Sequence, residues 1–213
     1  MQRRSDASTS ARVNYADCPF CQFDTVTDYI LQESPHFLIV ADHAPILEGH
    51  LLIIPREHYA CYGDVPAALD EELLLLKAKV QHFFELQYAS PLYWEHGVFH
   101  QTVFHAHLHC FPFGRIRYQS GGLYPGQLIH NQDDIRIWYQ ERGHYFFMDD
   151  TEHGYIFPPD AQYYFHIMKE VLAPGIAANG KSFPWSPSEL RQLEGRPLVA
   201  TLIARWQQFQ EIL

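Results

Sequence analysis

The chain has 213 residues, of which 47% are hydrophobic and 15% aromatic, so it can bury a sizeable core as one large domain or two small ones. Its formal net charge of −10 argues against a general nucleic-acid-binding protein, because such proteins cluster Lys and Arg against phosphates. A small phosphorylated ligand is not excluded, since it needs only local positive potential. The sequence has no run of about 18 apolar residues and no recognisable signal peptide, and we expect a cytoplasmic protein.

Residues 1–14 are polar, with three Arg and three Ser, and predict a disordered tail. The folded part opens with Cys18-Pro-Phe-Cys21, which places two thiolates on one turn where they can share a tetrahedral zinc ion. No second C-x-x-C occurs in the sequence, so two further ligands would come from elsewhere, and histidines are the expected choice. A thioredoxin-type redox pair is disfavoured, because no βαβ pattern follows.

The next elements predict a sheet with one long helix against it. Apolar runs over 37–41 and 49–56 predict two strands that pair as an antiparallel hairpin. We expect Asp64 to cap a helix over 66–88, whose apolar stripe packs on a sheet. Residues 92–97 predict a third strand, antiparallel to the strand that follows it.

The stretch from Gln101 to Pro112 carries the most specific pattern in the chain. His105, His107 and His109 alternate with apolar residues, which is the period of a strand with one functional face and one core face. The outer two Cα atoms would lie roughly 13 Å apart, so one zinc ion cannot easily reach all three rings. Such a row suits one imidazole that attacks while its neighbours orient it, hold an anion or bind a separate metal. A buried network of satisfied histidines is the alternative.

The second half of the chain predicts further strands followed by helices. Residues 114–126 read as a Gly-rich loop without the G-K-[ST] of a phosphate-binding P-loop. The strands would form a second small sheet or extend the first. The expected strands cover 135–139, 144–148 and 154–157, and the expected helices cover 161–173, the stretch from a capping box at 186–189 to Leu193, and 198–212 after a break at 195–197.

Together these features resemble the histidine triad (HIT) family. The resemblance rests on the C-x-x-C pair, on Asp42, on Gly49-His-Leu-Leu-Ile-Ile-Pro-Arg-Glu-His58 and on Gln101-Thr-Val-Phe-His-Ala-His-Leu-His109. It implies an α+β fold with an antiparallel sheet of about five strands and a packed helix, forming a catalytic domain over residues 15–115. Residues 116–213 would be a C-terminal extension of strands and then helices, packed on that core.

Carried over position by position, the resemblance makes His107 a nucleophile that attacks the α-phosphate of a nucleotide. The nucleotidyl-histidine intermediate would then be hydrolysed to a nucleoside monophosphate. His109 and Gln101 would hold the phosphate oxygens or the leaving group. Asp42 would accept hydrogen bonds from ribose hydroxyls, and Phe20 would pack against the base.

The resemblance also implies a structural zinc ion held by Cys18, Cys21, His50 and His105. Such a closed four-ligand site would attach the N-terminal segment to the histidine strand. His105 would then serve the metal, while His107 serves the substrate.

The sequence departs from the family at the end of the third predicted strand. The family often has Asn-x-Gly where this chain has Glu95-His96-Gly97, and often has Gly where this chain has His100. Both positions border the leaving-group side of the site, so we expect them to affect the choice of substrate more than the type of reaction.

These observations favour a nucleotide hydrolase acting on dinucleoside polyphosphates or nucleoside phosphoramidates. The alternatives are a nucleotidyltransferase resembling galactose-1-phosphate uridylyltransferase, or a non-catalytic zinc-stabilised nucleotide-binding module. His109 favours hydrolysis, because that transferase carries Gln at the matching position. We expect a small-molecule nucleotide as partner, no nucleic acid and no membrane, and we leave a homodimer open.

Overall fold

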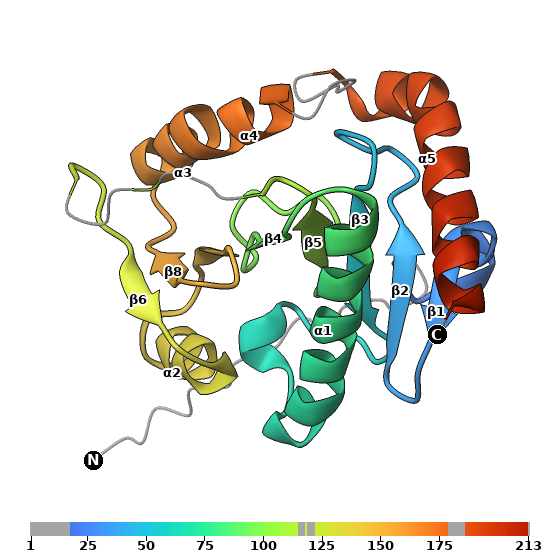
Figure 1. Ribbon diagram of the computed structural model, residues 1–213. Coiled ribbons are helices and arrows are strands. Elements are labelled where there is room, and N and C mark those ends of the chain that lie inside the picture. Colours follow the sequence, from blue (N-terminus) through green and yellow to red (C-terminus); the bar gives the residue numbers. More distant parts are fainter. Residues whose placement is uncertain (1–17, 115–117, 119–121, 179–185, 213) are drawn as a thin grey trace, which may run out of the picture.

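In the part of the chain that the structure describes, eight strands form one antiparallel sheet, in the order β1-β2-β3-β5-β4-β7-β8-β6 (Figure 1). The computed structural model describes residues 18–114, 118, 122–178 and 186–212. The strands are β1 (Ile30–Glu33), β2 (Phe37–Ala41), β3 (Leu51–Pro55), β4 (Leu92–Glu95), β5 (Leu108–Phe111), β6 (Gln127–Ile129), β7 (Phe146–Asp149) and β8 (Gly154–Phe157). The expected tail over residues 1–14 lies outside the described residues, as does part of the predicted loop over 114–126.

Helices cover both faces of this sheet. One face packs against α1, α2 and α5, whose buried side chains join those of β2, β3 and β5 in the largest core cluster. The other face packs against α3 and the helical turns that follow it, which run across the top of Figure 1. The helices are α1 (Asp70–Gln87), α2 (Gln132–Arg142), α3 (Ala161–Ile167), α4 (Ala173–Ala178) and α5 (Ser188–Glu211), with a π-helical turn (Met168–Leu172) and 3₁₀ turns (Phe23–Thr25, Thr27–Tyr29, Tyr62–Asp64 and Ala67–Leu69).

The two halves of the chain meet at β4. Tyr93, Trp94 and Glu95 of β4 pair with Asp149, Met148 and Phe147 of β7, so β7, β8 and β6 continue the sheet that β1 to β5 begin. The α+β fold with an antiparallel sheet is therefore confirmed. Strands β1 to β5 lie within residues 15–115, where about five strands were expected, and the strands of the second half extend this sheet instead of forming a separate one.

The strand expected over residues 135–139 is wrong, because this segment lies in α2. The alternating Ile-Arg-Ile pattern suggested a strand, but Asn131 caps a helix by accepting a hydrogen bond from the backbone N–H of Asp134 at 3.2 Å. Ile135 and Trp138, three residues apart, then fall on one helix face and are both buried. The helix cap and this helical spacing outweigh the β-propensity of the isoleucines.

The expected break at residues 195–197 is also wrong, because α5 continues from Ser188 to Glu211 through Pro197. Leu202, Trp206 and other side chains on one face of α5 are buried in the core, and this packing offsets the backbone hydrogen bond that Pro197 cannot make. Gly195 is required by close approach, since a Cβ there would lie 2.7 Å from the ring of Pro45. The expected capping box at 186–189 is not formed, as the residue before the helix is Pro187 and it makes no side-chain cap.

The other helices differ from expectation only at their ends. Asp64 does not cap α1, which begins at Asp70 after a 3₁₀ turn and carries acidic residues in its first turn. The helix expected to end at Pro174 continues to Ala178, with the π-helical turn just before the proline. A wider turn there relieves the clash between a proline ring and the carbonyl four residues earlier.

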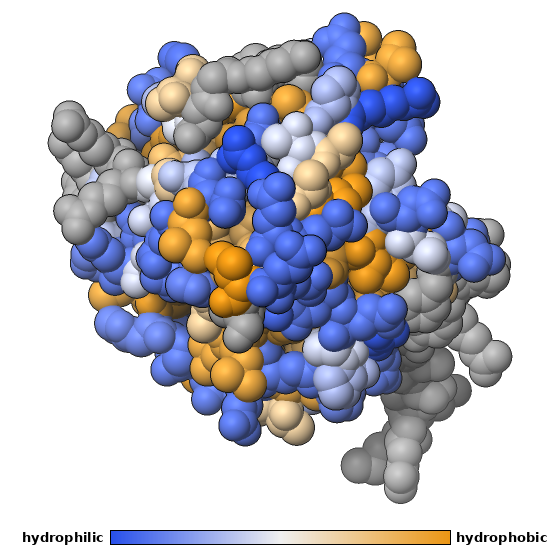
Figure 2. Space-filling model, turned by 45° about the vertical axis from the view of Figure 1, so that its right-hand side comes forward, coloured by the Kyte–Doolittle hydropathy of each residue, from blue (hydrophilic) through white to orange (hydrophobic). Residues whose placement is uncertain are grey.

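Hydrophilic residues predominate on the face shown in Figure 2, with hydrophobic residues in small groups between them. Among the helices that the structure describes, none is both long enough and apolar enough to cross a membrane.

Candidate active site

The histidine stretch leads into β5, which lies between β3 and β4 in the sheet. Of the three histidines only His109 lies within the strand; His105 and His107 precede it. The backbone N–H of Ala106 bonds to the carbonyl of Tyr59 at 2.7 Å, outside the ladder of the sheet. Ala106, like Leu108 of β5, is buried in the α1-side core, so the alternation of faces that the sequence predicts is retained.

His107 is held in one tautomer by the backbone. Its Nδ1 lies 2.7 Å from the carbonyl oxygen of His105. A carbonyl oxygen only accepts, so Nδ1 carries the proton and Nε2 of the neutral ring keeps its lone pair. Burial lowers the pKa of His107, which favours this neutral form. The ring therefore has the protonation state that a nucleophile needs.

A second chain of hydrogen bonds orients His109. Nε2 of His50 lies 3.0 Å from Nδ1 of His109, and Nδ1 of His50 accepts a hydrogen bond from the backbone N–H of Ile46 at 3.3 Å. Burial lowers the pKa of His50 to about 4, with the carboxylate of Asp42 only partly opposing this, so the ring is neutral. Its proton is then on Nε2, which donates to His109, and the proton of neutral His109 is left on its own Nε2.

Two thiols and two imidazoles gather on the N-terminal side of His107. Candidate ligand atoms of Cys18, Cys21, His58 and His105 all lie within 4.8 Å of one another. Nδ1 of His105 is 3.5 Å from each sulfur, and Nδ1 of His58 is 3.2 Å from Sγ of Cys21. Nε2 of His105 donates to the carbonyl of Pro55 at 2.8 Å, which leaves Nδ1 as the ligand atom.

This donor set fits a zinc ion. Zn–S bonds of about 2.3 Å and Zn–N bonds of about 2.0–2.1 Å in a tetrahedron separate sulfur from nitrogen by about 3.5 Å, close to the spacing found here. Burial raises the pKa of Cys21 to about 11, and the neighbouring Cys18 adds to the rise. The raised pKa means that ionising this thiol costs free energy. A bound cation would offset that cost by pairing with the thiolates.

The fourth member of the cluster is His58 rather than His50, which corrects the expected ligand set. Strands β3 and β5 pair antiparallel with Ile53 opposite Leu108. His105 therefore meets the end of β3 that leads to His58, whereas His50 lies at the other end, where it joins Asp42 and His109 in a separate group.

Gln101 uses its amide to hold its own loop. Its oxygen accepts from the backbone N–H of Val98 at 3.0 Å, and its nitrogen donates to the carbonyl of His105 at 2.8 Å. The loop needs this support, because Val98 and His100 have φ angles of 76° and 56°, a region that costs energy for residues other than glycine. Gln101 would have to exchange these bonds to contact a phosphate.

The two residues expected to contact the nucleoside lie at the site. The ring of Phe20 packs edge-on against the imidazoles of His105 and His107, with centroids 5.7 and 5.4 Å apart. Asp42 accepts a hydrogen bond from the backbone N–H of Ala44 at 2.8 Å and lies 3.3 Å from Nδ1 of His50.

Three residues of the site were not among the sequence candidates. His58 was visible in Pro-x-x-His but was not assigned to the metal. His96 packs against His109, with ring centroids 5.4 Å apart. Arg191 of α5 is close enough for its charge to help lower the pKa of His50 and His109, although burial is the main cause for both. No sequence signal placed Arg191 here, because it reaches the site only through the docking of α5.

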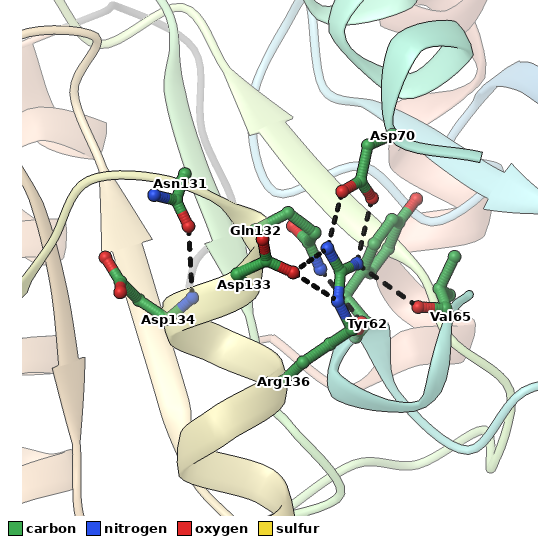
Figure 3. A network of polar contacts seen from close by, with 8 residues as sticks. All are labelled: Tyr62, Val65, Asp70, Asn131, Gln132, Asp133, Asp134 and Arg136. Carbon is green, nitrogen blue, oxygen red and sulfur yellow. Dashed lines mark hydrogen bonds and ion pairs between the residues drawn. The ribbon is translucent and has the colours of Figure 1, made fainter. Parts of the chain in front are cut away.

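A cavity of about 800 Å³ lies on the opposite face of the sheet, between α1, α2 and the C-terminal strands. Leu108 lines it, so the cavity is separated from the histidine rings by β5 itself. Figure 3 shows the polar network beside it, in which the guanidinium of Arg136 bonds to Asp70 at 2.9 Å and to Asp133 at 3.1 Å. Because β5 separates this cavity from the three histidines, it is not the candidate active site.

Comparison with known proteins agrees with this geometry. The family model described as HIT domain matches residues 24–115. The bifunctional adenosine 5′-phosphosulfate phosphorylase/adenylylsulfatase of Arabidopsis thaliana is 32% identical over 125 residues, covering 53% of this chain and 84% of that protein. The adenosine 5′-monophosphoramidase of Saccharomyces cerevisiae is 28% identical over 113 residues, covering 52% of this chain and 70% of that protein.

Similar solved structures carry the same family name. A HIT family hydrolase from Legionella pneumophila is 26% identical, with a TM-score of 0.39, and the match covers 49% of this chain and all of that one. A HIT family protein from Bacillus anthracis is 22% identical, with a TM-score of 0.41, covering 55% of this chain and 85% of that one. On the match to the HIT domain model and the 32% identity to the Arabidopsis protein, of which this chain covers 84%, the chain belongs to the HIT family.

Proposed function

We propose that the protein hydrolyses nucleotides at the α-phosphate through a nucleotidyl intermediate on His107. The observation that carries this proposal is the 2.7 Å hydrogen bond from Nδ1 of His107 to the carbonyl of His105, because it leaves the lone pair on Nε2. A fixed neutral imidazole of this kind is an activated nucleophile that needs no further deprotonation before it attacks.

The reaction has two displacements. Nε2 of His107 forms a bond to the α-phosphorus, and the bond from phosphorus to the leaving group breaks with its electron pair on that group. Water then attacks the same phosphorus and releases His107, giving a nucleoside monophosphate. A leaving amine takes up one proton from solvent in the first step, and the attacking water releases one proton to solvent in the second, so the site regains its starting state.

Charge that develops on the phosphoryl oxygens meets two sources of positive potential. Nε2–H of His109 is a donor fixed by His50, and such fixed donors are worth most where water is excluded. Arg191 supplies a positive charge near the same rings, although the net charge of the chain is −10. In this proposal Asp42 holds the ribose and Phe20 packs against the base.

A zinc ion bound by Cys18, Cys21, His58 and His105 would have a structural role. It would fix His105, whose carbonyl sets the tautomer of His107. The set has four protein ligands, which leaves no open position for substrate.

Adenosine 5′-phosphoramidate is the first substrate to test, because relatives from Saccharomyces cerevisiae and Schizosaccharomyces pombe are named adenosine 5′-monophosphoramidases. Dinucleoside polyphosphates and adenosine 5′-phosphosulfate are the further candidates.

The test measures release of AMP from adenosine 5′-phosphoramidate by the wild-type protein and by the variant His107→Ala. The proposal expects kcat to fall by more than about a thousandfold in the variant, with its Tm close to that of the wild type. His153→Ala, a change at an exposed histidine before β8, is the matched control and should keep full activity. Equal AMP release by His107→Ala and wild type would exclude His107 as the nucleophile.

A further inference from the structure

The loop between β2 and β3, residues 42–50, carries two polar side chains of the site, those of Asp42 and His50. At the base of the loop the backbone N–H of Asp42 donates to the carbonyl of His50 at 3.1 Å. Within the loop, the backbone N–H of Ala44 donates to the carboxylate of Asp42 at 2.8 Å. The backbone N–H of Ile46 donates to Nδ1 of His50 at 3.3 Å. The path of the loop backbone therefore sets where both side chains lie.

Arg191, near the start of α5, fastens this loop to the second half of the chain. Nε of its guanidinium donates to the carbonyl of Ala44 at 3.0 Å. Nη1 donates to the carbonyl of Ser186, just before the helix, at 2.8 Å. The guanidinium nitrogens lie in one rigid plane, so the two bonds together fix the loop relative to α5.

Two further contacts hold the same loop against one face of α5. Gly195 lies one turn after Arg191, and a Cβ there would lie 2.7 Å from the ring of Pro45. Nη2 of Arg205 lies 3.5 Å from the carboxylate of Glu48. In Figure 1 the helix, drawn in red, stands beside β2, from whose end the loop starts. The loop is therefore held by the helix as well as by its own hydrogen bonds.

The loop passes this constraint on to the histidine strand. Nε2 of His50 donates to Nδ1 of His109 at 3.0 Å, so a displacement of the loop would move the donor that orients His109. The guanidinium of Arg191 bonds to backbone carbonyls, and its geometric influence on His109 therefore runs through the loop and His50.

We propose that Arg191 is a positioning residue for hydrolysis: it fixes the loop over residues 42–50, and through His50 it fixes the ring of His109. A misplacement of about 1 Å costs up to about a hundredfold in rate, so the fit that the guanidinium maintains should be visible in kcat. The HIT domain model ends at residue 115, and α5 lies beyond it. The inference rests on the proposed function and gives the C-terminal half of the chain a part in that reaction.

The first experiment keeps the positive charge and removes the planar guanidinium. The kcat for release of AMP from adenosine 5′-phosphoramidate is measured for the wild type and for Arg191→Lys, well below the Tm of each. An ammonium group on a flexible chain cannot replace both bonds in the same geometry, so we expect kcat to fall about tenfold or more. Full activity in Arg191→Lys would mean that charge alone suffices, and would overturn the inference.

Arg196→Lys is the matched control for this change. Arg196 lies on the same helix and is exposed, and the variant should have the kcat of the wild type. A loss in Arg196→Lys equal to that in Arg191→Lys would assign the effect to α5 in general rather than to the contact with Ala44, and would also count against the inference.

A double-mutant cycle with His50 separates positioning from a general loss of stability. If Arg191 acts through His50, Arg191→Lys should change kcat by less than about threefold in a His50→Ala background, because the donor that it positions is already absent. Losses that multiply in the double variant would show that the two residues act independently, contrary to the inference. Arg191→Gln serves in place of Arg191→Lys if the lysine variant has a Tm well below that of the wild type.

These outcomes are distinct from failure of the proposed function. If the wild type releases no AMP, the reaction is not the one proposed, and the inference fails with it. If His107→Ala abolishes release while Arg191→Lys equals the wild type, His107 remains the nucleophile and only the role of Arg191 is excluded.

Discussion

His107 donates a hydrogen bond to the backbone of His105, whose own ring faces the thiols of Cys18 and Cys21. The two histidines thus have separate tasks although they are two residues apart. His105 belongs to the candidate metal cluster, and its carbonyl sets the tautomer of His107. The stability of the cluster and the state of the nucleophile are therefore linked through one residue.

Substitution of His58 and of His50 tests the corrected set of metal ligands. His58→Ala should lower the bound zinc per chain and reduce the free energy of unfolding by several kcal/mol, because zinc binding is coupled to folding. His50→Ala should keep one zinc per chain, since His50 lies outside the cluster. Metal analysis of both purified variants, with thermal unfolding, checks this. Loss of zinc in His50→Ala but not in His58→Ala would contradict the assignment.

His50→Ala should also lower activity without unfolding the protein. It removes the donor to Nδ1 of His109, and the loss of a fixed orientation costs about tenfold to a hundredfold in kcat. Steady-state kinetics on adenosine 5′-phosphoramidate measure this effect. Full activity in His50→Ala would mean that His109 needs no partner.

Glu95 predicts a specific dependence of stability on pH. Burial raises its pKa from 4.5 to about 7, although Tyr145 and Tyr62 donate to the carboxylate. The folded state therefore holds a proton that the unfolded state has lost between pH 4.5 and 7, so the contribution of Glu95 to stability falls as pH rises through this range, by about 3 kcal/mol in all.

Glu95→Gln removes this titration and keeps hydrogen-bonding groups in place. The difference in free energy of unfolding between the variant and the wild type should therefore move in favour of the variant from pH 5 to pH 8. Urea unfolding at both pH values gives this difference, and a constant value would contradict the raised pKa.

Gly195→Ala tests the docking of α5. In an exposed helix this change stabilises by about 1 kcal/mol, but here the added Cβ would lie 2.7 Å from the stiff ring of Pro45. We expect a loss of about 1–3 kcal/mol instead. Glu194→Ala, at the exposed neighbouring position, is the control and should have little effect. A higher Tm for Gly195→Ala would mean that α5 does not approach Pro45 closely.

The parts of the fold that local patterns determine could be predicted from the sequence. The alternation around His107 places the imidazoles on one face, and the apolar runs give β2 and β3. Helix α2 was missed because alternating isoleucines outweighed the cap at Asn131, and α5 was divided because the packing that tolerates Pro197 involves residues distant in sequence.

The set of metal ligands could not be predicted for a different reason. His50 and His58 flank the same strand, and the sequence alone does not say which end of β3 meets His105. The antiparallel register of Ile53 with Leu108 decides it, and no pairing between these two strands was predicted from the sequence. Arg191 depends on the docking of α5, for which the sequence held no signal.

Trapping the intermediate on His107 tests the central claim most directly. Wild-type protein is mixed with adenosine 5′-phosphoramidate, quenched in base to preserve a phosphoramidate bond, digested and analysed by mass spectrometry. We predict a peptide spanning residues 101–112 that carries one adenylyl group on His107, and no such peptide from His107→Ala. AMP release by the wild type with no adduct on this peptide, or an adduct on another residue, would contradict the account.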